Sequence, residues 1–134
     1  MSDQTLAERI ETIESSYEFM LAYAAQGRES DAGLSGGVSV RESLVGLSDA
    51  LLYIEKTVIE NDAASATVDF ANSIALDALH ARRAVSLVLS RPTISSQLVD
   101  NLNATIHLRA VLTDLFLIDE ALKCQNSPSQ EQGT

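Results

Sequence analysis

The chain has 134 residues, of which 46% are hydrophobic and only 4% aromatic, and its formal net charge is −10. This length suits a single domain with a core of its own. Because aromatic residues are scarce, leucine, isoleucine, valine and alanine must build that core. The acidic balance argues against a surface that binds nucleic acid or an anionic membrane, since both attract lysine and arginine. A basic surface on a partner protein would be attracted instead.

The sequence also bears on cellular location. The single cysteine, Cys124, leaves no pair for an intrachain disulfide, which fits a reducing compartment. The first residues lack the basic and apolar segments of a signal peptide. No stretch approaches the roughly 18 apolar residues that a membrane-spanning helix needs. We therefore expect a cytoplasmic protein that does not associate with membranes.

The first predicted helix begins near Thr5 and ends near Gly27. Thr5 and Glu8 have the spacing of a capping box, and a glycine is a natural C-terminal stop. Along the helix, apolar or ring side chains step by four and three residues, as they do on the packed face of a helix: Leu6, Ile10, Ile13, Tyr17, Met20 and Ala24. Glycine and serine are frequent in the segment that follows, so a flexible loop is expected over residues 27–38.

The second predicted helix runs over about residues 40–60, after another capping box at Ser39 and Glu42. Its main apolar row has the same steps as the first helix: Val40, Leu44, Leu47, Leu51, Ile54 and Val58. A flanking row widens the apolar face, which predicts contact with two neighbouring helices: Val45, Leu52 and Ile59. The third predicted helix, over about residues 63–90, is rich in alanine and ends before Pro92.

The fourth predicted helix starts at a cap formed by Thr93, Ser95 or Ser96 and continues to about residue 123. Its second half is apolar on more than one side, which is typical of a central helix or one that packs against another chain. Residues 125–134 contain no apolar side chain and are expected to be disordered. The sequence therefore predicts an all-α, antiparallel four-helix bundle in a single domain, residues 1–124.

Motifs that carry catalysis or bind cofactors are missing from the sequence. There is no Gly-x-Ser-x-Gly nucleophile turn, no phosphate-binding loop and no Glu-x-x-His metal pair. We therefore assign no catalytic residue, no cofactor and no metal site. A candidate polar cluster consists of Asp77 and His80 on the third helix with His107 and Asp114 on the fourth. These residues could hold a metal ion or belong to ordinary solvated faces, and Asp114 is expected on the outer face of its helix.

His80 offers a different chemistry. Histidine-phosphotransfer domains are four-helix bundles of about this length that expose one histidine in mid-helix, with a basic residue three positions later. The segment is similar to that pattern through Arg83, whose cation could hold a phosphoryl group on the ring, and through the small Ala84. It departs at Arg82, where the family usually has an apolar residue, and at Ala84, where it usually has glycine. The resemblance makes His80, with Arg83, a candidate phosphoacceptor.

The strongest signal in the sequence is apolar helix surface beyond what four helices need among themselves. It predicts a homo-oligomer, most simply a dimer, or a subunit of a larger assembly. The interface candidates on the fourth helix are Leu108, Leu115, Phe116 and Ile118. We therefore predict a non-catalytic protein-interaction module: a small regulator, adaptor, accessory subunit or assembly chaperone that acts through apolar faces and an acidic surface. The alternatives are phosphotransfer through His80, and a helical-bundle enzyme or a ligand or metal binder with its site between helices.

Overall fold

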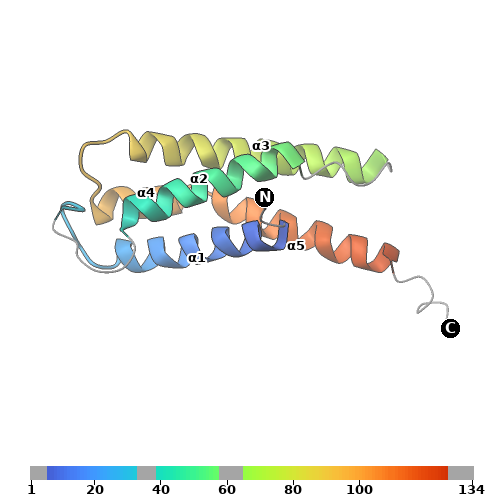
Figure 1. Cartoon of the computed structure of the whole chain (residues 1–134), viewed down its shortest axis with the longest axis horizontal. Helices are drawn as coiled ribbons and strands as arrows, with labels where there is room; N and C mark the ends of the chain where they lie inside the picture. The colour runs from blue at the N-terminus through green and yellow to red at the C-terminus, as the bar shows by residue number, and fades with distance from the viewer. Residues whose placement is uncertain (1–5, 33–38, 58–64, 127–134) are drawn as a thin grey trace.

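A computed structural model describes residues 6–32, 39–57 and 65–126 (Figure 1). Over these ranges the chain is all-helical and without strands, which confirms the predicted all-α class. The helices are α1 (Leu6–Ala24), α2 (Val40–Thr57), α3 (Ser65–Leu89), α4 (Ser96–Ala104) and α5 (His107–Asn126). The first three run along the long axis of the molecule, and α4 and α5 follow one another along it. None of the helices described here is both long and apolar enough to span a membrane.

Local sequence signals set several helix ends. α2 begins in the predicted capping box, where the Glu42 N–H donates to the Ser39 hydroxyl at 3.0 Å and the Ser39 N–H donates to the Glu42 carboxylate at 3.3 Å. α1 ends just before a turn at Gly27, whose φ of 67° lies in the region that favours glycine. The predicted capping box at Thr5 and half of the predicted loop, residues 33–38, lie outside the described residues.

The predicted fourth helix is two helices, so that prediction was wrong. α4 begins after Ser95, whose hydroxyl accepts a hydrogen bond from the Leu98 N–H at 3.0 Å. It ends at Thr105, where the hydroxyl donates to the Leu102 carbonyl at 2.7 Å and the backbone turns to an extended conformation. α5 starts two residues later and continues through Asn126, two residues past the predicted end of the domain. Residues 127–134 of the predicted disordered tail lie outside the described part of the chain.

The helices enclose one apolar core. α1 packs against α2 and α4, while α3 packs against α2 and α5. All described members of the main apolar row of α2 are buried: Val40, Leu44, Leu47, Leu51 and Ile54. The flanking row is not, because Val45 is 49% exposed and Leu52 is 37% exposed. The expectation that α2 contacts two neighbouring helices is nevertheless confirmed, since it packs against both α1 and α3.

Polar bonds tie the end of α1 to the start of α4. The Tyr23 hydroxyl donates to the Ile94 carbonyl at 2.6 Å, and burial raises the pKa of this hydroxyl. The buried Ser96 hydroxyl donates to the Tyr23 carbonyl at 2.7 Å and accepts from the Arg28 N–H at 2.8 Å. Because each bond joins residues about 70 positions apart, the network fixes how the two helices meet.

Arg41 connects α2 to the loop after α1 and to the end of α3. Its guanidinium pairs with Asp31 at 2.8 Å. It also donates to carbonyl oxygens that follow or end α3, those of Leu89 at 3.3 Å, Arg91 at 2.8 Å and Pro92 at 3.0 Å. A helix end leaves such carbonyls without intrahelical partners, so one side chain of α2 satisfies the end of α3. Burial would raise the pKa of Asp31, but hydrogen bonds from the Ile94 N–H and Arg41 hold that pKa below its usual value.

Candidate functional site

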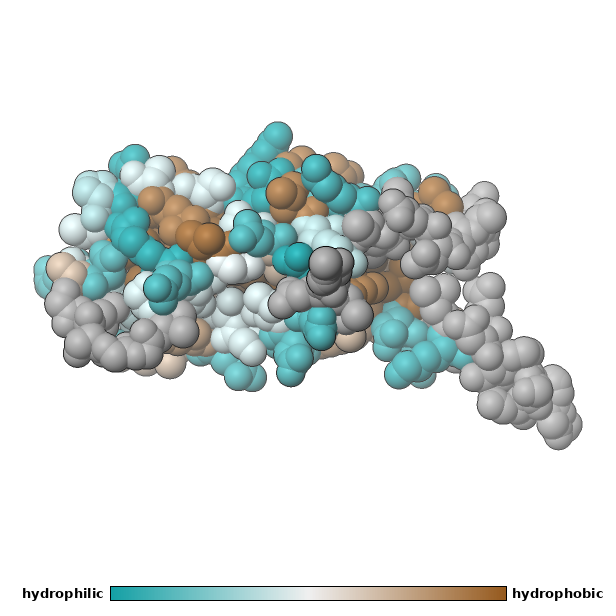
Figure 2. Space-filling view, viewed as in Figure 1, coloured by the Kyte–Doolittle hydropathy of each residue, from teal (hydrophilic) through white to brown (hydrophobic). Residues whose placement is uncertain are grey.

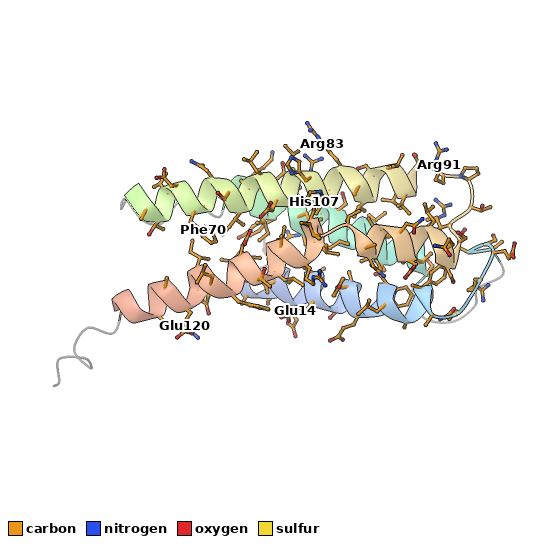
Figure 3. All side chains as sticks on the ribbon, turned by 180° about the vertical axis from the view of Figure 1, so that it is seen from behind. Glu14, Phe70, Arg83, Arg91, His107 and Glu120 are labelled. Atoms are coloured by element: carbon orange, nitrogen blue, oxygen red, sulfur yellow. The ribbon has the colours of Figure 1, made fainter. Side chains whose placement is uncertain are left out.

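Polar side chains of α3 and α5 meet in what we call the α3–α5 polar cluster: Asp77, His80, His107 and Asp114. Asp77 and His80 are three residues apart on α3, and His107 and Asp114 are seven apart on α5. Each pair therefore lies along one edge of its helix. α3 and α5 pack against each other, and Figure 3 shows His107 at the start of α5, directed toward α3.

The cluster brings two imidazoles and a carboxylate into one small space. The rings of His80 and His107 lie edge to face, with their centroids 5.1 Å apart and their planes at 60°. One nitrogen of each ring and one carboxylate oxygen of Asp77 all lie within 4.8 Å of one another. These are the two histidines of the sequence. The structure thus unites residues that the sequence named as candidates, in an arrangement that can hold a cation.

Asp114 lies beside Asp77 rather than on the outer face, so its predicted exposure was wrong. It is half-buried, and one of its carboxylate oxygens is buried without a hydrogen-bond partner in the described ranges. Burial, together with a hydrogen bond to Asp77 and the charge of Asp77, raises the pKa of Asp114 to about 7. Arg82, on the same helix as Asp77, donates to the Glu55 carboxylate through two nitrogens, and this contact raises the pKa of the guanidinium.

The candidate phosphoacceptor, His80, is exposed, and so is Arg83 three residues later on α3. Arg83 points away from the bundle in Figure 3. The face of the His80 ring toward α5 is occupied by His107. A phosphoacceptor role for His80 stays a prediction.

The interface candidates on α5 divide into two groups. Leu108, Leu115 and Ile118 are buried in the chain's own core, with exposed fractions of 3%, 1% and 9%. Phe116 is 50% exposed. The apolar row that suggested a partner surface therefore faces the neighbouring helices, and of these four residues Phe116 alone is on the surface.

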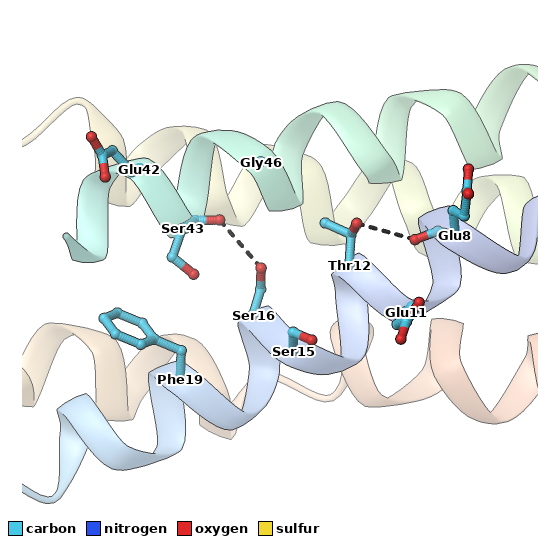
Figure 4. Close-up of a pocket in the computed structure, with 9 residues that line it drawn as sticks. All are labelled: Glu8, Glu11, Thr12, Ser15, Ser16, Phe19, Glu42, Ser43 and Gly46. Atoms are coloured by element: carbon cyan, nitrogen blue, oxygen red, sulfur yellow. Dashed lines mark hydrogen bonds between the residues drawn. The ribbon is translucent and has the colours of Figure 1, made fainter. Parts of the chain in front are cut away.

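A second feature, which the sequence did not reveal, is a groove between α1 and α2, here called the α1–α2 groove (Figure 4). Its volume is about 610 Å³. The residues that line it are Glu8, Glu11, Thr12, Ser15, Ser16, Phe19, Glu42, Ser43 and Gly46. Small side chains meet at its centre, where the Ser16 hydroxyl donates to the Ser43 carbonyl at 3.4 Å. Because serine and glycine leave space between the two helices, the surface is hollowed here.

Charge is unevenly placed around the groove. Phe19 and Glu42 lie at one end, while Glu8 and Glu11 lie at the other. All three glutamates are exposed. The signal that could have located the groove is the coincidence of small residues on the facing sides of two predicted helices, beside an acidic segment.

The two sites occupy different edges of the molecule, because one lies between α1 and α2 and the other between α3 and α5. The groove is lined by serines, glutamates, a threonine, a glycine and a phenylalanine, and the cluster consists of aspartates and histidines. Comparison of the chain with protein-family models, curated proteins and solved structures finds no match.

Proposed function

We propose that the chain is a non-catalytic protein-interaction module whose α1–α2 groove holds a basic segment of a partner protein. The observation that carries the proposal is a groove flanked by three exposed glutamates on a chain of net charge −10. Lysine and arginine combine an apolar stem with a charged end. Their stems suit the space beside Phe19 and Gly46, and their charged ends suit the glutamates. Opposite charges would also speed association.

The proposal includes the antiparallel four-helix bundle predicted from the sequence. In this arrangement α1, α2 and α3 are three helices of the bundle, and α4 and α5 together take the place of the fourth. The contacts of α1 with α2 and α4, and of α3 with α2 and α5, support it. Such a bundle has grooves along its outer edges, and the α1–α2 groove is one of them.

The predicted homodimer stays a prediction and part of the proposed interaction role. Eight large apolar residues of the described ranges are more than a third exposed: Leu21, Val45, Leu52, Leu76, Leu87, Ile106, Phe116 and Leu117. Figure 2 shows hydrophilic residues between the apolar groups on one face of the molecule. Isolated apolar residues are normal on protein surfaces. The groove is therefore stronger support for an interaction role than these exposed apolar residues are.

Peptide binding tests the groove. The probe is a fluorescein-labelled peptide of alternating arginine and leucine, the control is the same pattern with glutamate for arginine, and the measurement is fluorescence anisotropy. We expect the basic peptide to bind and the acidic one not to bind. The variant Gly46→Leu should weaken binding at least tenfold, since a Cβ at Gly46 meets no atom within 4 Å and a longer side chain would fill the groove.

A pair of charge variants separates the groove from the overall charge. Glu11 lines the groove, whereas Glu18 is exposed on the same helix and does not line it. Glu11→Gln should weaken the basic peptide about two- to fivefold, the range for one exposed ion pair, and Glu18→Gln should have less effect. Equal effects of the two variants, or unchanged binding by Gly46→Leu, would show that the peptide responds to net charge and not to this groove.

A further inference from the structure

We propose that the α3–α5 polar cluster is a binding site for a divalent transition-metal ion of the zinc type, with Asp77, His80 and His107 as its ligands. This site is independent of the peptide groove, because it lies between another pair of helices and shares no residue with it. Either proposal can therefore fail without the other.

The donor atoms fit such an ion. Zinc binds imidazole nitrogen and carboxylate oxygen at about 2.0–2.2 Å in tetrahedral sites, and two histidines with one carboxylate form a known kind of ligand set that leaves a fourth position open. Tetrahedral ligands at these lengths are roughly 3.4 Å apart. The three donor atoms here are within 4.8 Å of one another, so small side-chain rotations bring them to a shared ion. His80 is exposed, which gives the ion a path from solvent.

The charges of the cluster favour a cation. The carboxyl group of Asp114 lies beside that of Asp77, so two acidic side chains lie next to the two imidazoles. The ion pairs found within residues 6–32, 39–57 and 65–126 are Arg41–Asp31, Arg82–Glu55 and Lys123–Asp119, so no lysine or arginine of these ranges pairs with the cluster. In the proposed site Asp114 is not a ligand but a positioning residue, because its hydrogen bond orients Asp77.

The ligand types also select the metal. Imidazole suits zinc, cobalt, nickel and copper, whereas magnesium and calcium prefer all-oxygen sites. The sequence holds two histidines, 27 positions apart and on different helices, and both are in this cluster.

Metal titration tests the proposal. The full chain is stripped of metal with EDTA, dialysed, and titrated with Zn²⁺ or Mg²⁺ by isothermal calorimetry. We expect one Zn²⁺ per chain, no detectable binding of Mg²⁺, and a rise in the thermal unfolding midpoint with Zn²⁺ because the ion binds the folded state. Co²⁺ in place of Zn²⁺ should give the visible absorption of a tetrahedral site. A chain that takes up no Zn²⁺ would overturn the proposal.

Variants locate the ion. His80→Ala, His107→Ala and Asp77→Asn should each weaken Zn²⁺ binding at least tenfold. Asp69→Asn is the matched control, since it removes an exposed carboxylate from the same helix with the same change in charge, and it should bind as the wild type does. Circular dichroism verifies the fold, and the exposed position of His80 makes its replacement the safest for the core.

The variants also distinguish the site from its rivals. A phosphoacceptor role for His80 does not require His107, so loss of Zn²⁺ binding in His107→Ala speaks for the metal site. Binding that survives both histidine replacements, or that falls equally in Asp69→Asn and Asp77→Asn, would show that Zn²⁺ associates with the acidic surface and not with this cluster.

Discussion

The carboxyl group of Asp114 has a pKa of about 7 in the folded protein because it is partly buried and lies beside Asp77. In the unfolded chain an aspartate ionises near pH 4, at its ordinary pKa of about 3.9. Between these two values folding takes up a proton, so the free energy of unfolding falls as pH rises. The stabilisation from protonated Asp114 is therefore complete below about pH 4 and is lost progressively up to about pH 7.

Asp114→Asn should remove this pH dependence. In metal-free protein, the stability of the variant relative to wild type should rise by about 2–3 kcal/mol between pH 5 and pH 8, since an amide has no proton to lose. Urea unfolding in EDTA at both pH values measures the difference. Asp77, His80 and His107 are present in both proteins, and because Asp77 interacts directly with Asp114, the difference reports the titration of this carboxyl pair. An identical difference at the two pH values would contradict the prediction.

At the scale of elements, Gly46 lowers the stability of α2, and a substitution can remove this effect. Glycine inside a helix is less stable than alanine by about 0.5–1 kcal/mol, and an added Cβ at this position meets no atom within 4 Å. Gly46→Ala should therefore raise the free energy of unfolding by about 0.5–1 kcal/mol. Gly27→Ala is the opposite case, because φ at Gly27 is +67°, and it should lower stability by about 1 kcal/mol. Urea unfolding of both variants decides whether the signs differ as expected.

The helices could be predicted from the sequence because their apolar residues repeat every three or four positions. The start of α2 could also be predicted, because Ser39 and Glu42 form a capping box. The break between α4 and α5 could not be predicted from the sequence. No glycine or proline occurs at residues 104–106. The interruption is at Thr105, whose hydroxyl bonds to the Leu102 carbonyl, and threonine residues also occur inside helices without stopping them, as Thr113 does in α5.

The candidate site could be predicted only in part. Helical spacing placed Asp77 with His80, and His107 with Asp114, on two helix edges. Whether those edges face each other depends on the rotation of α3 and α5 about their axes, and the apolar pattern of a single chain does not determine that rotation. The same ambiguity affected Leu108, Leu115 and Ile118, because an apolar row has the same appearance whether it packs inside the chain or against a partner. The groove could not be predicted either, because it forms only where small residues of two helices face each other, and that again depends on how the helices are rotated.

At the scale of the whole molecule, the two proposed sites are separated by the core. The groove lies between α1 and α2, and the metal site between α3 and α5, with one cluster of buried apolar side chains among the helices. Sites that share no residue and no partner generally contribute independently, within about 0.5 kcal/mol. The two sites can still affect each other through charge, because a bound Zn²⁺ offsets part of the net charge of −10. At 0.1 M salt, interactions between exposed charges are largely screened beyond about 10 Å.

We therefore predict that Zn²⁺ changes the affinity of the chain for the basic peptide by no more than about twofold. Anisotropy titrations in 0.1 M salt, with Zn²⁺ and with EDTA, measure this ratio. Asp77→Asn is the control, because any effect of Zn²⁺ that persists in it arises at the groove glutamates or on the peptide and not at the cluster. A tenfold change in wild type that disappears in Asp77→Asn would contradict the prediction. It would mean that α3 and α5 shift on binding the metal and carry that shift through the core to α1 and α2, since affinity changes only when the ion distinguishes two arrangements of the helices.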